Sequence, residues 1–125
     1  MDELQELQES NELLTKSIVD IISETYRFKK TFKRILSKLN DEDCTKYDSQ
    51  FAWFTKRVEK AAENAGLRIE DFTDQEYDAG MAVTALNIED FDPDDILCVD
   101  QMIEPVIMKG EIIQKPGTVI LRRKD

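Results

Sequence analysis

Histidine is missing from this chain of 125 residues, which also has only four glycines, three prolines and two cysteines. Without histidine the chain lacks the commonest general base and metal ligand, and with them any Ser-His or Cys-His catalytic pair. The few glycines form no glycine-rich phosphate loop. Cys44 and Cys98 lie far apart in no metal-type spacing, and we interpret both as reduced thiols. We therefore expect no catalytic residue, no metal and no cofactor, and a binding protein in place of an enzyme.

Positive charge is also scarce, since 17 Lys and Arg residues stand against 27 Asp and Glu residues and give a net charge of −10. Binding to phosphates needs neutralising Lys and Arg, so we expect no nucleic-acid partner and no binding to an anionic membrane. No apolar run is long enough to cross a membrane. The first residues, Met-Asp-Glu-Leu, are acidic where a signal peptide is basic. We expect a cytoplasmic protein.

A long amphipathic helix is predicted from Asp2 to about residue 40, a stretch without Pro or Gly. Its apolar residues alternate spacings of three and four over about five heptads, which is typical of a coiled-coil seam. Asn11 falls at an a position, where a buried Asn fixes the register and favours two parallel strands. The alternative is a single helix packed on its own chain. The residues predicted to form the homodimer are Leu4, Leu7, Asn11, Leu14, Ile18, Ile21, Phe28 and Phe32.

Two further groups of side chains lie in the second half of this predicted helix. A second apolar stripe widens the apolar surface, as expected where other helices pack on it; it consists of Ile22, Tyr26 and Leu36. A basic cluster is interpreted either as a solvated helix face or as a patch for an acidic partner. It consists of Arg27, Lys29, Lys30, Lys33, Arg34 and Lys38.

A second helix is predicted after the acidic break at residues 40–43. It starts with Asp48 or Ser49 as N-cap, runs to about residue 64 and is stopped by Gly66. We interpret Trp53 on this helix as a packing anchor, and the alternative is a partly exposed surface aromatic. Residues 1–66 together form a helical dimerisation region.

Beyond Gly66 the apolar periodicity shortens and is interrupted by Pro and Gly, the pattern of a compact β-module. The predicted strands are Leu67–Ile69, Ala82–Leu86, Ile96–Ile103, Val106–Met108, Glu111–Ile113 and Thr118–Leu121. The fold class is therefore α+β, with a long N-terminal coiled-coil helix, a short helical bundle and a small C-terminal β-domain over residues 67–125.

Two motifs in the β-domain are similar to known functional sites, a calcium-binding loop and a modified lysine. The acidic run Asp90–Asp95 lacks the central glycine of a calcium loop, and we interpret it as a solvated turn. Met108-Lys109 is similar to the modified lysine of biotin- and lipoyl-carrier domains. Too few residues follow Lys109 to supply the strands that such a domain needs, so this reading is the weaker one.

Taken in order, these parts resemble the GrpE family, the nucleotide exchange factors of DnaK-type chaperones. The resemblance covers a little over half of the chain, from about residue 54 to Leu121. The segments that carry it are Val58–Leu67, Glu70-Asp71-Phe72, Tyr77-Asp78, Ile96–Glu104, Val106–Gly110, Ile112-Ile113 and Val119-Ile120-Leu121.

The resemblance implies a homodimer whose β-domain binds the ATPase domain of a DnaK-type chaperone and promotes ADP release. The expected chaperone-binding residues are Glu104, Pro105, Val106, Ile107, Met108, Lys109, Val119 and Leu121. Ile107 and Met108 are adjacent in a strand, so we expect one of the two to be exposed. The alternative is a coiled-coil structural or adaptor subunit that keeps the scaffold without exchange activity.

Overall fold

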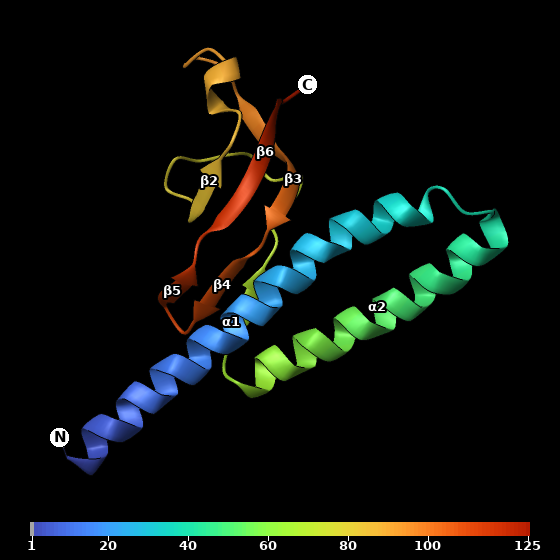
Figure 1. Ribbon diagram of the computed structural model, residues 1–125. Coiled ribbons are helices and arrows are strands. Elements are labelled where there is room, and N and C mark those ends of the chain that lie inside the picture. Colours follow the sequence, from blue (N-terminus) through green and yellow to red (C-terminus); the bar gives the residue numbers. More distant parts are fainter. Residues whose placement is uncertain (1) are drawn as a thin grey trace. The chain divides into compact units, whose positions relative to one another are not determined.

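The computed structural model describes residues 2–125 and divides the chain into two compact units, Met1–Gly66 and Leu67–Asp125. The fold is α+β: two helices are followed by two small three-stranded sheets (Figure 1). Gly66 adopts a φ of +76°, a left-handed conformation that glycine reaches without a Cβ clash. The predicted helix stop at Gly66 is confirmed.

The first helix, α1 (Glu3–Leu36), is 34 residues long and confirms the long N-terminal helix. The Asp2 side chain caps it by accepting a hydrogen bond of 2.8 Å from the Gln5 backbone N–H. Acidic side chains lie in its first turn and basic ones, Lys33 and Arg34, in its last turn. Both charges complement the helix dipole, so local sequence signals fix both ends.

The second helix, α2 (Asp41–Asn64), begins well before the predicted start, so the prediction of Asp48 or Ser49 as N-cap is wrong. The Asn40 side chain is the cap and accepts a hydrogen bond of 2.8 Å from the Asp43 backbone N–H. The acidic residues that follow favour the positive end of the helix dipole. The predicted second helix thus ends where expected, near residue 64, but begins earlier and is 24 residues long.

The two helices form an antiparallel hairpin (Figure 1). Three tertiary pairs define its register: Tyr26 with Glu59, Phe32 with Phe51, and Lys33 with Asp48. Because antiparallel partners step in opposite directions, the end of α2 lies opposite about residue 20 of α1. The first half of α1 thus extends beyond α2.

The second unit, here the β-unit, contains two sheets of different topology. In the first, β4 (Val106–Lys109) lies between β1 (Arg68–Glu70) and β5 (Ile112–Lys115), and all pairs are antiparallel. In the second, β6 (Gly117–Arg123) lies between the parallel β2 (Val83–Ala85) and the antiparallel β3 (Leu97–Glu104). The strand predictions are confirmed to within one or two residues at each end.

The core of the β-unit lies on β3 and β6. Leu97, Val99, Val119 and Leu121 are buried there, and partly buried aromatic and aliphatic side chains surround them. A Cβ on Gly117 would lie 2.9 Å from the Glu104 carbonyl oxygen, so only glycine fits where β6 begins. Within residues 2–125 no helix is long and apolar enough to cross a membrane.

Candidate interaction surfaces

One row of apolar side chains on α1 is exposed along nearly the whole helix. Its members recur at every seventh residue and are between 47% and 64% exposed. We call them the heptad row, which consists of Leu7, Leu14, Ile21, Phe28 and Ile35. An apolar row of this length is the pattern of a helix-pairing surface.

The adjacent row of the predicted seam behaves differently in the two halves of α1. Leu4 and Asn11 are exposed, whereas Ile18 and Phe32 are partly buried. The Phe32 ring packs 4.7 Å, centroid to centroid, from Phe51 of α2. The second half of the predicted seam therefore contributes one row to the hairpin and leaves the heptad row open.

A shallow apolar hollow lies beside the heptad row where α2 runs along α1. Ile21 and Phe28 line it from α1, Phe54 lines it from α2, and its volume is about 410 Å³. Phe54 is itself 46% exposed. The exposed apolar surface of the heptad row is thus extended by Phe54 of α2.

Two further predictions for the helical unit concern the second apolar stripe, which is confirmed, and Trp53. The second apolar stripe packs inward, since Ile22 and Leu36 are buried and Tyr26 donates a hydrogen bond of 3.1 Å to Glu59. The interpretation of Trp53 as a packing anchor is wrong and the surface alternative holds, because Trp53 is 62% exposed. Trp53 lies two positions after the buried Phe51, and residues with this spacing face different sides of a helix. Arg57 covers its ring at 5.0 Å.

The basic cluster on α1 is partly engaged within the chain. Lys33 pairs with Asp48, Arg27 lies 3.0 Å from Glu24, and the Lys29 ammonium lies 5.6 Å from the centre of the Tyr26 ring. These ion pairs are about half exposed, so each is expected to contribute less than about 1 kcal/mol to stability.

The expected chaperone-binding residues do not form an open surface in this structure. Val119 and Leu121 lie in the core of the β-unit. Glu104, Pro105, Val106 and Ile107 are also buried, which leaves Met108 partly exposed and Lys109 exposed. Ile107 and Met108 do differ in exposure, as strand alternation predicts.

A more exposed apolar pair lies in the next strand, on the hairpin formed by β4 and β5. Ile112 is 67% exposed and Ile113 is 50% exposed, and β5 is an edge strand of its sheet. Gly110, with a φ of +60°, makes the tight turn that precedes them. The sequence predicts the turn at Gly110. It does not predict the exposure of Ile112 and Ile113, because that depends on the order of the strands in the sheet.

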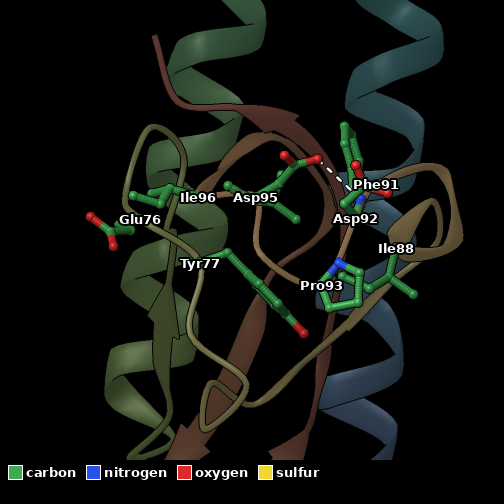
Figure 2. Close-up of a pocket in the computed structure, with 9 residues that line it drawn as sticks. Glu76, Tyr77, Ile88, Phe91, Asp92, Pro93, Asp95 and Ile96 are labelled. Carbon is green, nitrogen blue, oxygen red and sulfur yellow. Dashed lines mark hydrogen bonds between the residues drawn. The ribbon is translucent and has the colours of Figure 1, made fainter.

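The β-unit also contains a groove at its other sheet, with a volume of about 470 Å³ (Figure 2). Tyr77 lies between Ile96 on one side and Pro93 and Ile88 on the other in this view. The residues that line it are Glu76, Tyr77, Ile88, Phe91, Asp92, Pro93, Asp95, Ile96 and Leu97. The acidic run interpreted as a simple solvated turn is therefore one wall of a groove.

Two hydrogen-bonded contacts hold this wall in place. The Asn87 side chain makes both a donated bond of 2.9 Å and an accepted bond of 2.8 Å with the backbone of Leu121 on β6. The Asp92 backbone N–H donates to the Asp95 carboxylate at 3.0 Å (Figure 2). The groove is thus anchored to the core strand and shaped before any ligand binds.

Two acidic side chains of the groove pair with Arg123, the last residue of β6, and with Lys124, which follows it. Asp95 lies 3.3 Å from Arg123, and Glu76 lies 3.0 Å from Lys124. The hydrogen bond with Glu76 raises the pKa of Lys124 above its ordinary value of 10.5.

Comparisons with protein-family models, with curated proteins and with solved structures give no match to this chain. Within residues 2–125, no group of three His, Cys, Asp or Glu side chains is arranged to hold a metal ion. The geometry offers three apolar surfaces: the heptad row, the β4–β5 hairpin and the groove.

Proposed function

We propose that the protein is a nucleotide exchange factor of the GrpE type: a cytoplasmic homodimer that binds the ATPase domain of a DnaK-type chaperone and promotes ADP release. The observation that carries the proposal is the combination of an exposed heptad row on a long helix with a separate small β-unit. This is the order of parts that the GrpE resemblance implies.

The heptad row supplies the dimer in this proposal. The first half of α1 extends beyond α2, and the row continues beside Phe54 in the second half. Two copies that pair along the row would cover apolar side chains that are otherwise in water. The exposed Leu4, Leu7 and Leu14 side chains of the first half would pack as a two-stranded coil, with Asn11 fixing its register.

The β4–β5 hairpin supplies the chaperone contact in this proposal. Ile112 and Ile113 are large apolar side chains on an acidic unit, and such residues are typical anchors of a protein interface. Met108 and Lys109 of the expected set lie on the other strand of the same hairpin. We therefore assign the chaperone contact to Met108, Lys109, Ile112 and Ile113, in place of the buried residues of the expected set.

Exchange then follows from differential binding and needs no chemistry from the factor. A β-unit that binds the open ATPase cleft more tightly than the closed one shifts the chaperone towards the open state. ADP binds the closed cleft better, so its affinity falls by the same coupling factor. A coupling of about 1.4 kcal/mol is enough for a tenfold change.

The test is the release of a fluorescent ADP analogue from a DnaK-type chaperone of the same organism, followed by stopped-flow fluorescence. We expect the parent protein to accelerate release by about tenfold or more. The double variant Ile112→Ser, Ile113→Ser should lose most of that acceleration. Both side chains are at least half exposed, so its melting temperature should stay close to the parent's.

Leu86→Ser is the matched control, because Leu86 is 61% exposed in the same unit but lies outside the hairpin. It should accelerate release like the parent. If the parent accelerates and the double variant does too, the hairpin is not the contact. If the parent forms a dimer but never accelerates release, the adaptor alternative replaces the exchange function.

A further inference from the structure

We propose that the groove of the β-unit binds a peptide segment of a partner protein in which a large apolar side chain is flanked by lysine or arginine. The groove lies between the 76–77 segment and the 88–97 segment, on the sheet formed by β2, β6 and β3 (Figure 2). This binding surface does not depend on the proposed exchange activity.

The floor of the groove suits an apolar side chain. Tyr77 and Phe91 pack against the buried core, and Leu97 belongs to that core. Ile88 and Ile96 stand at the open side and are 43% and 58% exposed. A volume of about 470 Å³ lies in the lower part of the range for small-ligand sites, so it admits one large side chain with its neighbours.

The negative charge of the groove favours a peptide with Lys or Arg next to its apolar side chain. The β-unit, Leu67–Asp125, has 14 acidic and 6 basic side chains, so it holds −8 of the total charge of −10. Glu76, Asp92 and Asp95 all line the groove. This concentration of negative charge repels acidic peptides, nucleotides and anionic membranes, and it attracts Lys and Arg.

The protein's own Arg and Lys side chains already pair with carboxylates of the groove, which shows that guanidinium and ammonium groups fit there. Arg123 and Lys124 pair with Asp95 and Glu76, and the Arg123 guanidinium also lies 5.4 Å from the centre of the Phe91 ring. Asp92 and Asp94 are exposed and form no ion pair within residues 2–125. Asp92 lines the groove, and Asp94 lies two positions further along the same turn, outside the lining residues. The Asp92 carboxylate within the groove, with that of Asp94 next to it, is available for the basic residues of a bound segment.

The groove also has the rigidity that a binding site needs. The two Asn87 hydrogen bonds hold the 86–97 segment to β6, and the Asp92–Asp95 hydrogen bond closes its turn. A site formed before binding avoids the entropic cost of ordering its own loop. An exposed acidic turn without this anchoring would be only a solvated segment.

The experiment compares three fluorescein-labelled peptides by fluorescence anisotropy: Gly-Ser-Lys-Leu-Lys-Ser-Gly, its Glu-Leu-Glu counterpart and its Lys-Ser-Lys counterpart. The first tests charge and apolar character together, and each of the others removes one of them. We expect saturable binding of the first peptide and at least about tenfold weaker binding of the other two. Shifts in ¹⁵N–¹H spectra on adding the first peptide should map to residues 76–77 and 88–97.

Two variants test the walls separately. Asp92→Asn with Asp94→Asn, and Ile96→Thr, should each weaken the Lys-Leu-Lys peptide several-fold with little change in melting temperature, because all three side chains are exposed. Glu9→Gln with Glu12→Gln makes the same change in net charge on α1 and should leave binding unchanged. The proposal is overturned if no peptide binds up to about 1 mM, if the three peptides bind alike, if the shifts map outside the groove, or if the groove variants bind like the parent.

Discussion

The ring of Phe32 on α1 packs 4.7 Å from the ring of Phe51 on α2, centroid to centroid, and joins the two helices of the hairpin. Phe28, one turn earlier on α1, stacks on Phe32 at 6.1 Å but remains 53% exposed. Two aromatic residues four positions apart thus face different environments: Phe32 serves the hairpin, and Phe28 belongs to the heptad row. This division is the basis of the proposed dimer.

The first prediction separates folding from association. Phe51→Ala removes a side chain that is only 9% exposed and should lower the unfolding free energy by about 3 kcal/mol at any protein concentration. Phe28→Ala should have a small effect on the monomer and a larger one as concentration rises, because a dimer is stabilised by mass action. Denaturant unfolding followed by circular dichroism at two protein concentrations measures both. Equal, concentration-independent losses for the two variants would contradict the division.

The second prediction concerns the heptad row itself. Leu14→Lys places a charge in the row and should give a monomer, whereas Leu13→Lys should leave a dimer. Leu13 is a fair control, since it is 67% exposed against 59% for Leu14 but lies outside both rows of the seam. Sedimentation equilibrium of the parent and both variants decides the matter. A monomeric parent at micromolar concentration, or equal behaviour of the two variants, would rule out pairing through the row.

How far the sequence predicts this molecule depends on whether a feature is local. The long helix, the stop at Gly66 and the approximate strands follow from residue patterns over a few turns or residues. The start of α2 also follows a local pattern, because Asn40 followed by three acidic residues is typical of a helix N-terminus and not of a break. Trp53 was misplaced because the buried face of α2 is set by its pairing with α1.

The non-local features are different, since they depend on pairings between distant segments. The parallel pairing of β2 with β6 and the order β1-β4-β5 join strands that are far apart in the sequence. These pairings bury Val119 and Leu121 and expose Ile112 and Ile113. Strand alternation alone cannot assign such burial, so the site expected from the resemblance fell mainly on core residues. The groove likewise exists only because Asn87 is bonded to β6.

The third prediction concerns two glycines with different constraints. Gly117→Ala should destabilise the β-unit by about 1–3 kcal/mol, because the new Cβ would meet a backbone oxygen at 2.9 Å. At Gly66 no atom would lie within 4 Å of an added Cβ, so Gly66→Ala should cost only about 1–2 kcal/mol for its left-handed φ. Thermal unfolding of each variant measures the two destabilisations, and ¹⁵N–¹H spectra locate them. Gly117→Ala spectra unchanged in the β-unit would contradict the steric argument.

The fourth prediction concerns the basic cluster on α1. Changing Lys29, Lys30 and Lys33 together to Gln should move the melting temperature by only a few degrees. The Lys33–Asp48 ion pair that this change removes is about half exposed, and the Lys29–Tyr26 cation–π interaction is partly buried. Each is expected to contribute about 1 kcal/mol or less. Asp48→Asn, which removes the partner of Lys33, is the comparison and should have a similarly small effect. A large drop in melting temperature for the triple variant would show that the cluster is needed for folding.

The measurement that tests the central claim most directly is the affinity of the protein for the ATPase domain of a DnaK-type chaperone with and without ADP. Coupling between two ligands is reciprocal, so a protein that promotes ADP release must bind the ADP-free domain more tightly. Isothermal titration calorimetry should give an affinity at least about tenfold higher for the ADP-free domain. Equal affinity for the two states, or no binding to either, would contradict the exchange function.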